Sequence, residues 1–472
     1  MASSDTDSGF LKDPHILDLF AGPGGLDVAA HMLGVPSLGI EWDKNACETR
    51  YAAGLPTLHA DVSAVRQHRF EELPKALNVL AGGPPCQTYS VAGSGAGRKA
   101  LDKVEGLIHD LVAGADDQEI DKRLATLEGS SPEEQRREGW KPDRRTALVL
   151  EPLRYAIKAL HSPNRDRRPF DVIVLEQVPQ VKALWEVYRE VLESGLPGAD
   201  GRKVKYKVAK VETLRTEAYG VPQTRRRAIL IARLEQHGAP SLPGATHHTF
   251  NPHKPKQGGP EDEKAVAQAA AVQTALPIGT SRKPPVPLPW VHMWEVLGKT
   301  ERLPGGRKSS FKIVSNYGSG GDPKNRGVRT DRQPSFTVTG KVSRNAVLNP
   351  DGTPQKPDRL TIREAGILQT FPPNYPWSGG DRSQQVGNAV PPLFGMHVLT
   401  AALGLPPLTE EAEKKLRKNW REYSYDEVTT FRKEGCGEPD GCGPGCPKPE
   451  DQAVPSKSSR PRTGASAKRS EK

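Results

Sequence analysis

Short apolar runs alternate with amphipathic stretches over the first half of the chain. The runs that predict buried strands are residues 15–20, 37–41, 78–81, 171–175, 207–214 and 228–234. Helical periodicity appears between them, at residues 26–33, 146–160 and 181–193. Alternation of this kind predicts the α/β class, with a mostly parallel sheet covered by helices on both faces.

The pattern changes after residue 235. Pro, Gly, Lys and His dominate residues 236–355, and helical periodicity returns only at residues 356–406. We therefore predict a disordered N-terminus (1–12), a main α/β domain built from 13–235 and 356–406, a smaller irregular domain (236–355) and a polar, basic, flexible tail (407–472).

Residues 94–142 interrupt the alternation. They are charged and broken by Gly and Pro, with a helical patch near residues 120–127. A loop of this length in a compact domain is usually functional or mobile. We predict a mobile loop that closes over the substrate, and a disordered surface insertion is the alternative.

Composition narrows the class of partner and compartment. The 472 residues carry a formal net charge of +10, which favours a polyanionic partner. No apolar run reaches about 18 residues, so no membrane span is predicted. Five cysteines, an odd and sparse set, favour a reducing compartment, the cytoplasm, over a disulfide framework.

Polar residues follow the first three strands. A glycine-rich turn comes after the first, but Asp27 breaks the dinucleotide fingerprint. Glu41 ends the second strand about 20 residues further on, where an acid can bind ribose hydroxyls. Trp42 can stack on a purine, and Asp61 can accept from an exocyclic amine. These residues predict a site for an adenosine ligand without phosphate, and S-adenosylmethionine fits that description.

A cysteine follows the strand at residues 78–81. Pro85-Cys86-Gln87 lies on a stiff Pro-Pro turn at the carboxyl end of that strand, where open α/β sheets place their chemistry. A buried structural thiol is the alternative.

These segments belong to six ordered blocks that resemble the cytosine-5 DNA methyltransferases of bacterial type. The blocks are residues 18–25 (DLFAGPGG), 83–87 (GPPCQ), 176–178 (EQV), 223–227 (QTRRR), 360–372 (LTIREAGILQTFP) and 387–392 (GNAVPP). The family usually has Glu-Asn-Val, whereas this chain has Gln177 in the middle position. The resemblance implies a Rossmann-like, S-adenosylmethionine-dependent fold with a smaller target-recognition domain at residues 236–355.

The resemblance also implies a covalent mechanism with four catalytic residues. Cys86 would add to carbon-6 of cytosine, which makes carbon-5 nucleophilic. Glu176 would donate or share a proton at N3, and Arg225 and Arg227 would fix that acid and the ring carbonyl. No metal is required.

Further residues carry over by their place in the blocks. Those implied to border the cofactor are Asp18, Phe20, Ala21, Gly22, Gly24, Gly25, Leu26, Glu41, Trp42, Asp61, Pro84, Asn388 and Val390. Those predicted to contact DNA are Gln87, Ser90, Gln223, Arg226, Arg326 and Arg329, although basic loop residues more often touch phosphate than bases. The turn at Asn388 is interpreted as the cap that starts a helix.

The implied partner is double-stranded DNA, from which the target base must be flipped out. We expect a monomer that works beside a cognate restriction endonuclease. Three tail cysteines, Cys436, Cys442 and Cys446, lack the paired spacing of a zinc site, so a flexible tail is favoured over a metal site.

Two other functions compete. A tRNA cytosine-5 methyltransferase shares most blocks but carries Cys-Phe-Thr, which is absent here. A catalytically silent DNA-binding homologue would have lost the cysteine or the arginine pair, and both are present.

Overall fold

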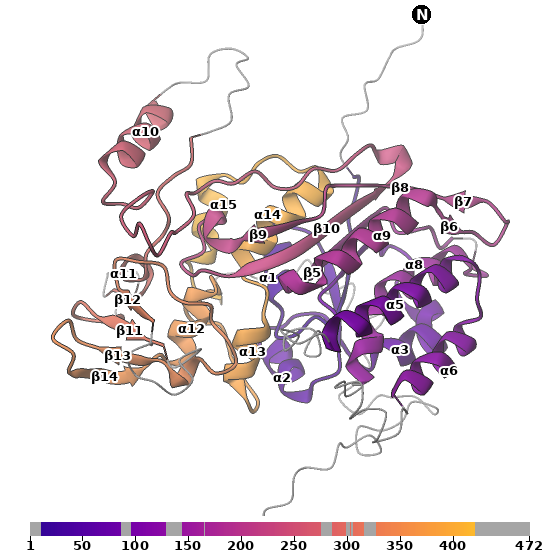
Figure 1. The fold of residues 1–472 in the computed structure, drawn as a ribbon, viewed down its shortest axis with the longest axis horizontal. Helices are drawn as coiled ribbons and strands as arrows, with labels where there is room; N and C mark the ends of the chain where they lie inside the picture. Colours follow the sequence, from indigo (N-terminus) through magenta and orange to yellow (C-terminus); the bar gives the residue numbers. More distant parts are fainter. Residues whose placement is uncertain are drawn as a thin grey trace, which may run out of the picture. The chain divides into compact units, whose positions relative to one another are not determined.

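The computed structural model describes residues 11–85, 96–128, 144–164, 166–274, 286–298, 303, 305–315 and 327–420. Its main sheet has the strand order β3-β2-β1-β4-β5-β10-β8, with β9 paired to β10. Figure 1 labels the β5, β10, β9 and β8 part of this sheet. The strands are β1 (Ile16–Leu19), β2 (Ser37–Glu41), β3 (Thr57–His59), β4 (Val79–Gly82), β5 (Val172–Gln177), β8 (Tyr206–Val208), β9 (Glu212–Arg215) and β10 (Arg226–Leu234). The first five run parallel and β10 runs antiparallel to β5, so the predicted mostly parallel α/β sheet is confirmed.

The strand order reverses at β1, which lies between β2 and β4. Ligands of open α/β sheets bind outside the carboxyl ends of the strands at such a switch point. The structure differs from the sequence prediction at residues 207–214, where two short strands, β8 and β9, replace the single predicted strand.

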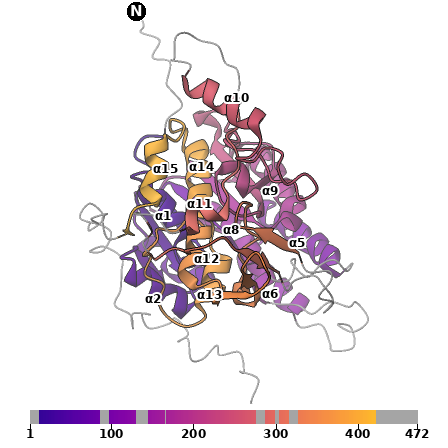
Figure 2. The same cartoon turned by 90° about the vertical axis from the view of Figure 1, so that its left-hand side faces the viewer.

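Alternate strand residues face two separate cores. Leu17 and Leu19 point into one core, whereas Ile16 points into the other. The helices that cover the first face are α5 (Ala96–Val112), α6 (Asp117–Glu128), α8 (Glu151–Leu160) and α9 (Lys182–Ser194), and those on the second are α1 (Gly25–Met32), α14 (Pro392–Leu403) and α15 (Glu410–Leu416). N-terminal α1 and C-terminal α14 pack on each other, so the two ends of the described chain complete one face (Figure 2).

Residues Arg382–Leu403 correct the expectation that no segment is apolar enough to span a membrane. This segment, α13 (Arg382–Asn388) followed by α14, has a mean hydropathy of 1.3 over its most apolar window. In the structure 83% of that window is buried, and α14 packs on α1 and β5. Core packing accounts for the apolar composition.

The segment after Cys86 is more ordered than predicted. Residues 96–128 form the helices α5 and α6, which confirms only the helical patch near residues 120–127. Val104, Ile108 and Ile120 are almost completely buried in the core beneath α9. These apolar side chains pack against the sheet layer, so residues 96–128 are helical and contribute to the core instead of forming an irregular loop. The rest of the predicted loop lies outside the described residues.

A second, smaller sheet follows, with the strand order β12-β11-β13-β14. Its short antiparallel strands are β11 (Lys312–Val314), β12 (Val328–Thr330), β13 (Ala346–Leu348) and β14 (Pro354–Arg359). They share a third core with α11 (Met293–Leu297) and α12 (Ile362–Leu368). Further elements, besides short 3-10 turns, are α2 (Lys44–Ala52), α3 (Val62–Ala64), the π-helical turn η1 (Val65–Arg69), the hairpin β6 (Leu196–Pro197) and β7 (Lys203–Val204), and α10 (Glu263–Thr274).

Candidate active site

The turn after β1 adopts backbone conformations that glycine favours. Gly22 has φ +56° and Gly24 has φ +100°. A Cβ on Gly24 would lie 2.2 Å from Leu55 Cδ1, and one on Gly25 would lie 2.1 Å from the Val390 carbonyl oxygen. The glycines therefore let the turn lie directly on the predicted C-terminal block. Among the residues that the structure describes, none lies within 4 Å of a Cβ built on Gly22.

Main-chain donors hold the acid at the end of β2. Glu41 Oε2 accepts from the Gly22 N–H at 2.7 Å, and Oε1 accepts from the Asp43 N–H at 2.7 Å. Burial raises the pKa of Glu41, and these hydrogen bonds partly offset that rise. Beside it, Trp42 is 39% exposed, which leaves an indole surface available for stacking. Asp61 lies after β3 and caps α3 by accepting from the Ala64 N–H at 2.9 Å.

A buried ion pair lies beneath the glycine turn. Arg50 is fully buried, and its Nη1 donates to Asp27 Oδ2 at 2.5 Å. The second oxygen of Asp27 accepts from the Ser37 hydroxyl at 2.8 Å. Burial, reinforced by the Asp27 carboxylate, raises the pKa of Asp18 well above its ordinary value. Sequence reasoning used Asp27 only to exclude a dinucleotide site and missed Arg50, since no local pattern marks the partner of a buried acid.

The other side of the same sheet edge carries the acid of the third block. Glu176 Oε1 forms an ion pair with Arg227 Nε at 2.5 Å, although the two groups are not aligned as a hydrogen bond. The register of β5 and β10 explains this contact, because Ile229 lies opposite Glu176. A Cβ on Gly83, two residues before Pro85, would lie 3.5 Å from Glu176 Oε2.

Gln177 connects β5 to the turn that precedes Cys86. Its Nε2 donates to the Pro84 carbonyl oxygen, and its Oε1 accepts from the Val178 N–H at 2.6 Å. The side chain is only 7% exposed. The longer amide therefore links the end of the strand to the Pro-Pro turn.

Arg225 and Gln223 lie deeper than predicted. Arg225 is 2% exposed and donates to the carbonyl oxygens of Val338 (3.1 Å) and Gly387 (2.9 Å). Burial, reinforced by Arg227, lowers its pKa well below the ordinary value. Gln223 is fully buried, donates to the Leu368 carbonyl oxygen at 3.0 Å and accepts from the Val338 N–H at 2.9 Å. This burial argues against the predicted DNA contact of Gln223, because the side chain does not reach solvent.

Two further interpretations need correction. Asn388 is the last residue of α13 and does not cap a new helix; its Oδ1 accepts from Gln384 Nε2 at 2.7 Å. Arg329 is stacked, with its guanidinium carbon 4.3 Å from the Phe250 ring centre and 4.9 Å from that of Phe336. Burial lowers its pKa. This packing argues against Arg329 as a reader of DNA bases.

Some predicted residues are exposed and others lie outside the described part of the chain. Arg226 is exposed at the start of β10. Cys86, Gln87, Ser90, Arg326 and the three tail cysteines lie outside the described residues. Among the described residues, no cluster of three His, Cys, Asp or Glu side chains is arranged to hold a metal ion.

The sheet order and the switch-point site define the fold as a Rossmann-like methyltransferase of the S-adenosylmethionine-dependent class. A family model described as C-5 cytosine-specific DNA methylase matches residues 15–117 and 199–403, which is well over half of the chain. The chain belongs to this family and is a DNA (cytosine-5-)-methyltransferase.

Individual relatives align over most of the chain. The Type II methyltransferase M1.HphI of Haemophilus parahaemolyticus is 24% identical, over 82% of this chain and 86% of that protein. The Type II methyltransferase M.AplI of Arthrospira platensis is 25% identical, over 80% and 82% respectively. Among solved structures, an S. pombe Dnmt2 methyltransferase aligns with a TM-score of 0.47 and 15% identity, over 83% of this chain and 98% of that one.

Proposed function

We propose that this enzyme methylates a flipped cytosine in a short duplex DNA sequence through a covalent adduct of Cys86. The observation that carries the proposal is the Glu176–Arg227 ion pair, which lies beside Gly83 at the carboxyl edge of the sheet. We infer that the guanidinium fixes the orientation of this carboxyl group, which exchanges a proton with N3 of the ring when a nucleophile adds to carbon-6.

The glycine turn and its neighbours fit S-adenosylmethionine. Glu41 retains lone pairs for the ribose hydroxyls, Trp42 offers a face to the purine, and Asp61 can accept from the exocyclic amine. The acidic character of Asp18, Glu41 and Asp61 disfavours a phosphate-bearing ligand. When bound, S-adenosylmethionine supplies an electrophilic methyl group.

The chain's own residues would then carry the chemistry on the base. The Cys86 thiolate forms a bond to carbon-6, and the electron pair of the 5,6 double bond becomes available at carbon-5. Glu176 shares its proton with N3, and Arg227 holds Glu176 in place. After methylation, a water molecule takes the carbon-5 proton and the electron pair of that bond restores the 5,6 double bond. The Cys86–carbon-6 bond then breaks, its electron pair returns to the Cys86 thiolate, and N3 returns its proton to Glu176.

Double-stranded DNA is the proposed substrate, and four residues are proposed to contact it. Exposed Arg226, together with Gln87, Ser90 and Arg326, is proposed to contact DNA, mainly at phosphates. Val390, whose backbone lies against Gly25, completes the cofactor side. We also propose that the enzyme acts as a cytoplasmic monomer beside a cognate restriction endonuclease, by analogy with relatives named Type II methyltransferases.

A trapping experiment tests the covalent step. Duplex DNA that carries 5-fluorocytosine at the target should form a stable protein–DNA adduct, because fluorine cannot leave carbon-5 as a proton does. We expect an adduct that requires S-adenosylmethionine and is absent in Cys86→Ala. Methylation of ordinary DNA without any trapped adduct would contradict the covalent mechanism.

A further inference from the structure

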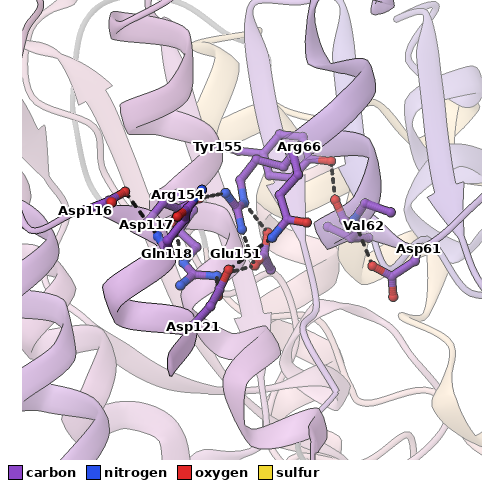
Figure 3. Close-up of polar contacts among 12 residues, drawn as sticks. Asp61, Val62, Arg66, Asp116, Asp117, Gln118, Asp121, Glu151, Arg154 and Tyr155 are labelled. Atoms are coloured by element: carbon purple, nitrogen blue, oxygen red, sulfur yellow. Dashed lines mark hydrogen bonds and ion pairs between the residues drawn. The ribbon is translucent and has the colours of Figure 1, made fainter. Parts of the chain in front are cut away.

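A buried ion cluster joins the cofactor side of the sheet to helix α6 (Figure 3). Arg66, in η1, is 3% exposed; its Nε donates to Glu151 Oε2 at 2.8 Å, and its Nη1 pairs with Asp117 Oδ2. Arg154, also almost fully buried, pairs with the other oxygen of Asp117 at 3.1 Å and with Asp121 at 2.7 Å. Arg154 Nη1 also pairs with Glu151 Oε1 at 3.2 Å, so both guanidinium groups share two carboxylates, the buried Glu151 on α8 and the half-buried Asp117 on α6.

This cluster holds the helical segment that Asp61 begins. Asp61 caps α3, and η1 with Arg66 follows α3 without a break. Tyr155, on α8, donates to the Val62 carbonyl oxygen at 2.7 Å, so α8 and α6 restrain this segment at two points. The pKa of Tyr155 is raised chiefly by burial and then by Glu151, with a further contribution from Asp61.

The cluster is supplied largely from outside the family match. That match ends at residue 117 and resumes at residue 199. Arg66 lies within the matched residues, but Glu151, Arg154 and the rest of α6 beyond Asp117 do not.

Arg66 lies in the π-helical turn η1. Such turns are rare and occur frequently at functional sites.

Among the described residues, loss of the Asp117 charge would leave Arg66 paired with Glu151, and Arg154 paired with Glu151 and Asp121. Removing one partner of a buried ion pair is costly because it leaves an uncompensated charge. Arg66 would keep Glu151, on α8, but would lose its charged partner on α6. Without that partner, η1 and the first turn of α3 would be held less firmly in their present position.

We propose that Asp117 is a positioning residue for the cofactor: acting through Arg66, it fixes the helical segment that presents Asp61 to the exocyclic amine of adenine. The inference rests on the proposed function, in which Asp61 accepts from that amine. Through Asp117 and Arg66, helix α6 then affects how tightly the adenine ring is bound.

The test compares two ligands that differ at the exocyclic group, S-adenosylhomocysteine and its inosine counterpart, whose ring carries a carbonyl oxygen in place of the amine. Dissociation constants are measured by calorimetry on the full chain. Asp117→Asn should weaken the adenosine ligand by about tenfold, as expected for loss of a hydrogen bond to a charged group, and the inosine ligand by less than about twofold. In an Asp61→Ala background, Asp117→Asn should have no further effect on the ratio of the two constants.

Matched variants separate positioning from simple structural support. Glu119→Gln removes an exposed carboxylate on the same helix, paired with Arg123, and should leave both constants unchanged. Asp117→Glu restores the charge and should recover part of the selectivity. Arg66→Lys keeps the charge but loses the planar fork, so it should reproduce the selective loss if Asp117→Asn does not fold.

Two results would overturn the inference. Equal weakening of both ligands by Asp117→Asn, or a lower melting temperature with the ratio unchanged, would make Asp117 merely structural. If Asp61→Ala itself leaves the ratio unchanged, the adenine assignment in the proposed function fails, and the inference that rests on it fails for that distinct reason.

Discussion

The two sides of the sheet's carboxyl edge hold their acids by different means. On the cofactor side, two main-chain N–H groups fix Glu41, and the buried Arg50–Asp27 pair supports the turn beneath. On the base side, a side chain holds the acid in place, because Arg227 pairs with Glu176. Main-chain donors survive every side-chain substitution except proline, so we expect the cofactor side to fail through loss of the fold and the base side through loss of chemistry.

The largest expected effect is on the base side. Glu176→Gln removes the titratable carboxyl group that exchanges a proton with N3 and pairs with Arg227, so the rate of methyl transfer should fall by about 10³-fold, within the range of general acid–base catalysis. Single-turnover kinetics at saturating DNA should show the loss, while the dissociation constant of S-adenosylmethionine stays within twofold of wild type. A large change in cofactor affinity would show that the two sides are not separable.

On the cofactor side, the corresponding change should act on stability. Asp27→Leu leaves Arg50 buried without its counter-ion and should reduce the free energy of unfolding by about 3–5 kcal/mol in a denaturant titration. The double variant Asp27→Leu with Arg50→Met removes both charges and should recover most of this loss. A stable single variant with weak cofactor binding would contradict the division between the two sides.

Low pH should destabilise the fold through two buried histidines, His247 and His397, which belong to neither side of the sheet's carboxyl edge. Burial lowers the pKa of His247 and of His397 to about 4, whereas each lies near 6.5 when unfolded. The unfolded chain therefore binds more protons below pH 6.5, and the stability held in full above that pH is lost as the pH falls toward 4. Each histidine contributes about 3 kcal/mol over this window.

Chemical unfolding at pH 7 and pH 5 would measure that loss. His397→Gln should flatten the pH dependence, because one of the two titrating groups is gone. A stability independent of pH between 7 and 5 would contradict the burial of both rings. Activity lost in acid must be corrected for this unfolding before it is assigned to either side of the edge.

The smallest expected effect comes from changing Gln177, whose side chain bonds to the Pro-Pro turn before Cys86. Gln177→Asn shortens the amide by one methylene group, which should weaken its bond to the Pro84 carbonyl and cost about 1 kcal/mol. We expect a rate several-fold lower with cofactor affinity unchanged. Complete loss of activity would mean that the turn before Cys86 depends wholly on the longer side chain.

Residues at strand ends were predictable from sequence, and their buried partners were not. Glu41, Asp61 and Glu176 each follow an apolar run, and parallel strands bring their carboxyl ends to one edge. Arg50 was missed because its partner Asp27 is distant in sequence and local patterns do not encode such pairs.

Two other sequence predictions, for the insertion at residues 94–142 and for the basic residues, also lacked information on tertiary contacts. Charge and glycine content favoured a loop at residues 94–142, yet apolar residues spaced along α5 and α6 pack into the core. Arg225 and Arg329 were predicted to reach substrates, but carbonyl oxygens and aromatic rings of the protein surround them. Tertiary contacts decide whether an arginine faces the protein or a ligand.

The most direct test of the central claim is transfer of labelled methyl from S-adenosylmethionine to unmethylated duplex DNA, followed by bisulfite sequencing, with Cys86→Ala in parallel. We predict label at a cytosine within one short sequence for the wild-type enzyme and none for the variant. Label on DNA from Cys86→Ala at a comparable rate, or no label on duplex DNA from the wild-type enzyme, would contradict the account.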